Sequence, residues 1–487
     1  MSNSQSADFN FPRLSLTSVQ MGVWMDQMRI PDSPHYNIGT VVRVTGFIDQ
    51  TLFAKALEKL ASHHSALRLV FGMNNNGVPW QHIRETISIP FCSMDFSKRL
   101  SPERDAMQLI SNEMNCLLPL DGRVMWSCML IRISRECYIW SARFHHIICD
   151  GVSVSNFAND LSQTYTCMWK GERDQRERPS SFDAYWEIEH NYLESSRSER
   201  DRQFWTEYLR KLPSALFTTL PTPREEGEDI KSGSYAWCLD RETYERLESY
   251  AEQYGVAENS FFIALLMSYF SRVFNIEDIV VGLAVHNRFG KLHKQTIGMF
   301  SSVIPVRVKV DAKGSFSNLL KLIGGELRRC YRHQRLPLSE INRCASIGCM
   351  GKTRLYDISI TLNSFSGKVK FGDAIGEGTR LQNYNEQLPL NIYVNDYKKG
   401  DVVVDFLYNP LYIREGYIVR MVDCLGLMLK EILVSNVTML SHLPVMSREE
   451  YFTILDSFNN TYSWYPGEAL IHELFEQQVG RTPEAVA

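Results

Sequence analysis

Hydrophobic and polar residues alternate along this chain with two periods, which predict helices and strands in mixed order. Residues 52–62 form the clearest amphipathic helix, because their apolar side chains recur at i, i+4 and i+8. Residues 138–148 are rich in β-branched and aromatic side chains and predict a buried strand. A helical stripe follows at residues 152–169. A buried strand that leads through a short turn into a helix is therefore predicted in the first half of the chain.

The same alternation continues to about residue 446 and predicts an α/β fold with mixed sheets. Further helices are expected at residues 14–27, 199–212, 241–254, 259–274 and 316–333. Further strands are expected at residues 36–45, 66–71, 278–284, 303–310, 358–362, 390–394 and 402–407. The stretch at residues 170–181 is mostly charged residues, proline and glycine, which is typical of a linker. We therefore predict a lead-in at residues 1–13, lobes at 14–180 and 181–446, and a C-terminal connector at 447–487.

Composition narrows the class of protein. A chain of 487 residues is too long for one ordinary core. The net charge of -4 and the lack of a basic run give no reason to expect a nucleic-acid or membrane partner. The eleven cysteines contain no Cys-x-x-Cys pair, which favours a reducing compartment. No signal peptide is recognisable, and the longest apolar run, residues 261–270, is too short to cross a bilayer. We expect a cytoplasmic protein.

The chemically informative segment is residues 144–153, FHHIICDGVS, at the predicted turn between strand and helix. An imidazole titrates near neutral pH and can exchange a proton under working conditions. Adjacent residues of a strand point to opposite faces, so only one histidine of the pair faces a given cleft. We assign His146 to the cleft as the catalytic group and His145 to a structural role inside the first lobe. The simpler alternative is that both are ordinary core or surface histidines.

Asp150 and Gly151 complete the pattern His-His-x-x-x-Asp-Gly. A buried aspartate needs a cation or several N–H donors, and Arg68 and Arg307 are the predicted partners. Asp150 would then shape the loop and would not act as a base. The N–H group of Gly151, at the start of a helix, could stabilise an oxyanion. A metal site is disfavoured, because adjacent histidines on a strand are poorly placed to share one ion.

This segment resembles the active-site motif of condensation domains of nonribosomal peptide synthetases and of their chloramphenicol-acetyltransferase-like relatives. Other segments resemble family motifs in the same order, namely residues 14–24, 63–71, 182–186, 297–308, 332–341 and 406–413. The chain departs from the family pattern at His63 and Ser65, and Ser301 and Ser302 replace a Val-Asn pair. Residues 465–487 resemble the beginning of an adenylation domain. The resemblance covers nearly the whole chain.

The resemblance implies two chloramphenicol-acetyltransferase-like lobes in a V, with a substrate tunnel between them. It also implies that the domain binds no cofactor of its own. The acceptor would arrive on an aminoacyl carrier protein, and the donor as acyl-CoA or on an acyl carrier protein, so the substrates ride on phosphopantetheine or coenzyme A. An adenylation domain would follow in the same polypeptide. The candidate tunnel residues are Ser153, Ile297, Met299, Ser301 and Ser302.

The predicted reaction is attack of an α-amine on a thioester carbonyl. A free α-amine has a pKa of about 7.7–8.0, so part of it is already neutral at cellular pH. His146 would accept the proton or hydrogen-bond the amine. Within this family the start of the chain and residues 297–308 favour a starter domain, which attaches a fatty or aryl acid to the first amino acid. The alternatives are an elongation domain, a free-standing acyltransferase, and a non-catalytic domain that recruits carrier proteins.

Overall fold

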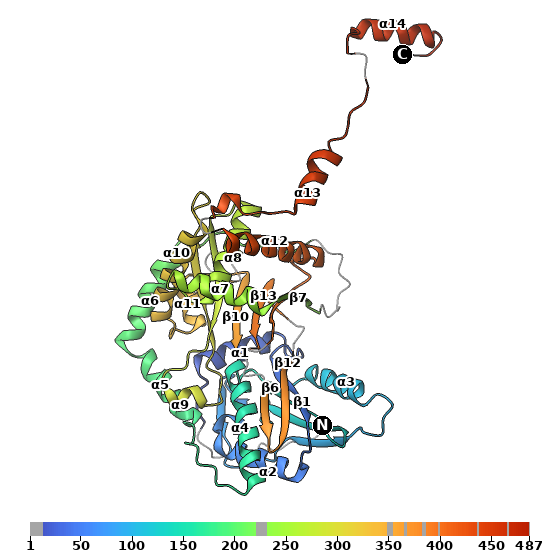
Figure 1. Ribbon diagram of the computed structural model, residues 1–487. Helices are drawn as coiled ribbons and strands as arrows, with labels where there is room; N and C mark the ends of the chain where they lie inside the picture. The colour runs from blue at the N-terminus through green and yellow to red at the C-terminus, as the bar shows by residue number, and fades with distance from the viewer. Residues whose placement is uncertain are drawn as a thin grey trace.

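The computed structural model describes residues 13–486 apart from 221–230, 348–353, 365–367, 382–385, 398–399, 436–437 and 465–466. Figure 1 shows two α/β lobes, one above the other, and a C-terminal tail that leads away from them. Nearly all of the predicted lead-in, residues 1–13, lies outside the described residues. The predicted domain boundaries themselves stay predictions.

The first lobe contains a six-stranded mixed sheet covered by helices on both faces. Its strand order is β11 (Lys368–Phe371), β12 (Ala374–Leu381), β1 (Asn37–Thr45), β6 (Cys137–His145), β5 (Trp126–Ser134) and β4 (Phe91–Asp95). Only the β4–β5 pair is parallel. The remaining elements are α1 (Ser18–Arg29), α2 (Gln50–His63), the 3-10 turn η1 (Ser65–Arg68), the hairpin β2 (Leu69–Met73) and β3 (Pro79–Ile83), α3 (Pro102–Met114) and α4 (Gly151–Lys170).

Alternation along the central strands explains why helices cover both faces of this sheet. On β1, Val42 belongs to the core shared with α2 and α4, whereas its neighbour Val41 packs in a separate cluster with Ile110 of α3. Trp140 and Ile139 divide in the same way on β6. Because successive side chains of a strand point to opposite faces, a strand buried on both sides carries a continuous apolar run.

The second lobe also contains a six-stranded mixed sheet. Its order is β7 (Gly233–Leu239), β14 (Val402–Tyr408), β13 (Leu390–Asp396), β10 (Ile358–Ser364), β8 (Asp278–Val285) and β9 (Ser302–Lys309). Its β13–β10 and β10–β8 pairs are parallel. The helices are α7 (Arg241–Gln253), α8 (Glu258–Phe274), α9 (Lys291–Gln295), α10 (Phe316–Arg332), α11 (Leu338–Cys344), α12 (Glu415–Val434) and the turn η3 (Leu440–His442). Helices α5 (Phe182–Leu193) and α6 (Ser196–Tyr208) connect the two lobes.

The two lobes do not follow the sequence order completely. Strands β11 and β12 come from the second half of the chain but belong to the sheet of the first lobe, and Figure 1 shows the orange β12 beside β1. β12 pairs with β1 in antiparallel register from Gly39–Leu381 to Thr45–Ile375. In addition, the hydroxyl of Thr40 donates to the carbonyl of Thr379. The chain therefore crosses back from the second lobe to close the edge of the first.

Most of the elements predicted from periodicity are present, with ends shifted by a few residues. The predicted strand at residues 66–71 is partly wrong, because residues 65–68 form the turn η1 and the strand β2 begins at Leu69. The elements that were not predicted are strands β3, β4, β5, β7, β11 and β12 and helices α3, α5, α9, α11 and α12, besides the helices of the tail. β12 has the sequence AIGEGTRL, whose glycines and charged residues hide the strand pattern.

The helices of the tail after residue 446 are exposed. It contains α13 (Arg448–Phe452), the π-helical turn η4 (Thr453–Ser457) and α14 (Ile471–Arg481), and none of the three has a buried residue. Figure 1 shows α14 far from both lobes. None of the helices in the described ranges has the length and apolar character required to cross a membrane.

Candidate active site

His146 lies one residue beyond the end of β6, where the chain turns toward α4. Its N–H group donates to the carbonyl of Tyr36 at 2.8 Å, so the β1–β6 ladder holds the backbone one residue past the strand. Its side chain is half-buried, and Nδ1 lies 3.2 Å from the sulfur of Met299. A thioether sulfur can only accept, so this hydrogen bond requires the proton on Nδ1. In the neutral ring the basic lone pair is then on Nε2.

His145 points the other way, into the first lobe, and is 1% exposed. Its Nδ1 accepts the N–H of Ile147, so its Nε2 carries the proton toward Gln27 Oε1 at 3.3 Å. Burial, helped by the neighbouring His146 and His35, lowers the pKa of His145 to about 3. A buried ring whose two nitrogens both hydrogen-bond within the lobe is not accessible to a substrate. The geometry therefore agrees with a structural role for His145.

Asp150 is the N-cap of α4 and is completely buried. Its carboxylate accepts six hydrogen bonds, two of them from the guanidinium of Arg288 at 2.7 and 2.8 Å. The other donors are the N–H groups of Ser153, Phe300 and Ser301 and the hydroxyl of Ser301. Burial raises the pKa of Asp150, but the charge and hydrogen bonds of Arg288 outweigh it and lower the pKa to about 2.

The predicted cation partners of Asp150 are wrong. Arg307 pairs with Asp278 at 2.6 Å, near the far end of β9 from Ser301. At about 3.3 Å per residue along a strand, it is too distant to reach Asp150. Arg68 donates to backbone carbonyls of the first lobe, including Ala61 and Glu85. The true partner is Arg288, in the loop after β8.

One feature of the sequence could have pointed to Arg288 as the partner of Asp150. It is an isolated arginine shortly after a strongly apolar strand. Its side chain is 1% exposed, and its guanidinium lies over the ring of Phe300 at 4.3 Å. It also donates to the hydroxyl of Ser153 at 2.7 Å. Only the tertiary structure shows that this loop of the second lobe meets the start of α4.

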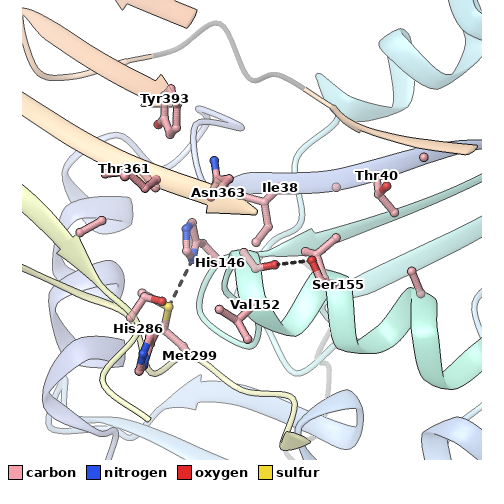
Figure 2. Close-up of a pocket in the computed structure, with 18 of the residues that line it drawn as sticks. Ile38, Thr40, His146, Val152, Ser155, His286, Met299, Thr361, Asn363 and Tyr393 are labelled. Carbon is pink, nitrogen blue, oxygen red and sulfur yellow. Dashed lines mark hydrogen bonds between the residues drawn. The ribbon is translucent and has the colours of Figure 1, made fainter. Parts of the chain in front are cut away.

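A cavity of about 490 Å³ lies between the lobes beside His146 (Figure 2). Gly151, Met299, Ser301 and Ser302 line it, and the expectation that the last three lie along a substrate tunnel fits this position. Ser153 and Ile297 do not line it, contrary to prediction. Ser153 is fully buried and bonds Gly298 through its hydroxyl, and Ile297 is in the apolar core.

The first lobe lines the cavity with both polar residues, such as Thr40 and Asn159, and apolar ones, which we call the apolar wall. Its apolar members are Ile38 and Val42 of β1, Val152, Val154 and Ala158 of α4, and Val369 of β11. The second lobe contributes polar side chains from β10 and β13, which we call the polar wall. It also contributes His286 and the apolar residues Ala284, Val285, Met299 and Val303. Figure 2 shows His286 beside Met299, on the side of His146 opposite Asn363. The cavity thus has an apolar wall on β1, β11 and α4 and a polar wall on β10 and β13, and His146 belongs to the same lining.

His286 is a second histidine of the cavity, and sequence reasoning missed it. Its Nδ1 accepts the N–H of Arg288 at 3.1 Å. Burial, followed by the charges of Arg288 and Lys294, lowers its pKa. Within the described ranges, no group of three histidine, cysteine or acidic side chains is placed to hold a metal ion.

The fold and the site define a class of protein. The family model described as "Condensation domain" matches residues 12–455. The chain therefore belongs to the condensation-domain family, whose members are amide-bond-forming acyltransferases of nonribosomal peptide synthetases.

Relatives and solved structures agree with this family. The chain is 26% identical over 477 residues to the dimodular nonribosomal peptide synthase of Bacillus subtilis (strain 168), covering 97% of this chain and 20% of that protein. It is 25% identical over 389 residues to the isonitrile lipopeptide synthase of Streptomyces coeruleorubidus, covering 78% of this chain and 26% of that protein. The chain thus spans about a fifth of the first relative's length and about a quarter of the second's.

Among solved structures, the starter condensation domain of rhizomide synthetase RzmA superposes with a TM-score of 0.77 at 20% identity, covering 90% of this chain and 100% of that one. The first condensation domain of the calcium-dependent antibiotic synthetase, with a substrate analogue, gives 0.76 at 22% identity, covering 89% and 99%. These likenesses confirm the predicted mixed α/β fold with two chloramphenicol-acetyltransferase-like lobes.

The buried ion pair of Asp150 and Arg288 should contribute more to the free energy of unfolding than an exposed ion pair does. Asp150→Ala strands a buried cation and should lower the free energy of unfolding by about 3–5 kcal/mol. Asp150→Asn should cost less, because the amide oxygen still accepts hydrogen bonds. Urea denaturation measures both. Asp121→Ala, which removes an exposed pair with Arg123, is the matched control and should change stability by less than about 1 kcal/mol. An unchanged stability in Asp150→Ala would show that the pair does not hold this loop.

Acid should remove the stabilisation by Asp150. The pKa of the aspartate falls from about 3.9 in the unfolded chain to about 2 in the folded one, so its contribution is complete above about pH 5. It is lost as the pH falls from about 4 to 2, and amounts to about 2–3 kcal/mol. Denaturation of the wild type and of Asp150→Asn at several pH values should show the stability gap narrowing in acid. A gap independent of pH would contradict the lowered pKa.

Proposed function

We propose that this domain is a starter condensation domain, which N-acylates the first carrier-bound amino acid with a fatty or aryl acyl thioester. The observation that carries the proposal is the apolar wall of the cavity beside His146, formed by β1, β11 and α4. A methylene moved from water into such a wall contributes about 0.8 kcal/mol. Solved starter domains of rhizomide synthetase with C8-CoA share the fold, and one relative is a lipopeptide synthase, which supports the same assignment.

In the proposed reaction the acceptor's α-amine attacks the thioester carbonyl. A C–N bond forms while the carbonyl π electrons move to oxygen, and Nε2 of His146 takes the amine proton. Collapse of the adduct breaks the C–S bond, and the thiolate leaves and takes a proton from the imidazolium. The amine is a good nucleophile once neutral, so most of the acceleration comes from alignment of the two thioesters in the cavity. His146 carries one proton from the amine to the leaving thiolate.

The developing oxyanion would lie near the start of α4. The N–H groups of Gly151 and Val152 occupy the first turn and border the cavity, and neither donates to another atom in the described part of the chain. The helix dipole adds a partial positive charge at this end. Asp150 takes no proton in this scheme, because Arg288 and the surrounding N–H groups hold it ionised.

The proposed partners follow from this chemistry. The acceptor is an aminoacyl carrier protein, and the donor is an acyl-CoA or an acyl carrier protein, with phosphopantetheine carrying the substrates. We further propose that an adenylation domain follows the tail in the same polypeptide and that the synthetase is cytoplasmic. An elongation domain is the second candidate, since the polar wall of the cavity offers partners to a peptidyl amide.

His146 is the first residue to test. His146→Ala should lower the rate of amide formation by about 10²–10⁴, because the amine proton loses its acceptor. The readout is the intact mass of the acceptor carrier protein after incubation with an acyl donor. The melting temperature should change little, since the ring is half-buried at a cavity wall. His63→Ala, on α2 away from the cavity, is the matched control and should keep full activity. Full activity in His146→Ala would remove His146 from the mechanism.

The donor assignment predicts a chain-length profile. Acylation efficiency should climb over several methylenes and then fall where the apolar wall ends. Ala158→Leu should move this cutoff to shorter acids, because packed interiors yield little to added volume. Lys170→Leu, at the end of α4, is the control and should leave the profile unchanged. Rapid reaction of peptidyl donors, with refusal of acyl donors of every length, would make the domain an elongation domain.

A further inference from the structure

The polar wall of the cavity is built by two neighbouring parallel strands of the second lobe. In the β10–β13 register Ser359 lies beside Asn391, Thr361 beside Tyr393, and Asn363 beside Asn395. Five of these six residues line the cavity, the exception being Asn395. Two leucines, Leu362 and Leu388, are the apolar members of the same wall. Figure 2 shows Thr361, Asn363 and Tyr393 on the side of His146 away from Met299.

This polarity is unusual for the interior of a parallel sheet. Central parallel strands are normally apolar on both faces. The other face of the same pair follows that rule, since Ile358, Ile360, Ile392 and Val394 are buried in the core of the second lobe. A polar group taken out of water costs free energy unless it is hydrogen-bonded. The run of polar residues on the cavity face therefore indicates a ligand that pairs with them.

A hydrogen-bond network fixes the side chains of this wall from behind. The amide nitrogen of Asn391 donates to Glu386 at 2.7 Å, and its oxygen accepts from the hydroxyl of Ser359. Asn363 donates through its amide nitrogen to Asn395 at 3.0 Å, and Asn395 donates in turn to Asp405 at 2.9 Å. The amide of Asn363 is thus held in one orientation, with its nitrogen toward the network.

Two polar atoms of the wall remain for a ligand. The side-chain oxygen of Asn363 and the hydroxyl of Thr361 bond no other atom in the part of the chain that the structure describes. The oxygen accepts hydrogen bonds, and the hydroxyl both donates and accepts. A ligand group with a hydroxyl or a primary amide matches this pair, whereas an alkyl group leaves both atoms desolvated and unpaired.

We propose that the β10–β13 face is the subsite for the side chain of the acceptor amino acid and selects a side chain with a hydroxyl or an amide. This inference rests on the proposed function, in which the apolar wall of the first lobe takes the acyl chain. The two substrates meet at His146, so the acyl chain and the acceptor face different walls. A site that hydrogen-bonds a substrate group rejects an isostere that lacks it far better than an apolar pocket rejects an extra methylene.

The test compares isosteric acceptors on one carrier protein with a single fatty acyl donor. The carrier is loaded in turn with threonine or valine and with asparagine or leucine, and kcat/KM for amide formation is measured by intact mass. The wild type should prefer the polar member of at least one pair by at least about tenfold. Thr361→Val, which removes only the hydroxyl, and Asn363→Leu should each reduce that preference several-fold.

A matched control separates this subsite from the rest of the cavity. Ser155→Ala removes a hydroxyl from the α4 side, where that group already bonds the carbonyl of Gly151. It should leave the acceptor preference unchanged. The donor chain-length profile should stay the same in Thr361→Val and Asn363→Leu, because the acyl chain lies on the other wall. Since Thr361→Val keeps the shape of the side chain, its outcome does not depend on whether Asn363→Leu folds.

Three outcomes would overturn the inference. Equal kcat/KM for polar and apolar acceptors in the wild type would reject the subsite and leave the condensation reaction standing. A change of donor chain length in Thr361→Val, without a change of acceptor preference, would assign this wall to the donor. Absence of amide product with every acceptor and donor would overturn the proposed function itself, and the subsite with it.

Discussion

The rest of the site depends on one buried ion pair, between Asp150 and Arg288. Two charges removed from water are costly, and they persist here because every oxygen of the carboxylate is saturated with donors. The aspartate is the first residue before α4 in the first lobe, and the arginine follows β8 in the second. The same carboxylate gathers the N–H groups of Phe300 and Ser301. Satisfying this charge therefore fixes the start of α4, the end of β8 and the start of β9 against one another.

That constraint decides where the two lobes can form a common cavity. Ser153, one turn into α4, exchanges hydrogen bonds with both backbone groups of Gly298, and β12 crosses back to pair with β1. Met299, next in the chain, comes to lie against His146. The apolar wall of the cavity then comes from β1, β11 and α4 of the first lobe, and the polar wall from β10 and β13 of the second. In the reaction that we propose, the acyl chain uses the apolar wall and the amino acid the polar wall.

The two adjacent histidines show how one position along the chain changes the surroundings of a side chain. His145 is the last residue of β6 and faces the packed interior, where burial holds the ring neutral. His146, one residue later, faces the cavity and is tied at Nδ1 by the sulfur of Met299. The hydrogen bond from the N–H group of His146 to Tyr36 holds the first residue of the turn beside β1. Asp150 then caps α4, which begins at Gly151.

The local elements could be predicted from the sequence, because periodicity indicates which face of a helix or strand is buried. The His-His-x-x-x-Asp-Gly motif could be recognised as well. It therefore predicted α2, β6 and α4, and the opposite orientations of His145 and His146. The pairing of segments far apart in the chain could not be predicted from the sequence. Arg288 as partner of Asp150, the return of β12 to the first lobe, and the burial of Ser153 and Ile297 depend on contacts between residues more than a hundred positions apart. Only the tertiary structure decides these, since an arginine or a polar strand has the same local pattern whichever distant partner it meets.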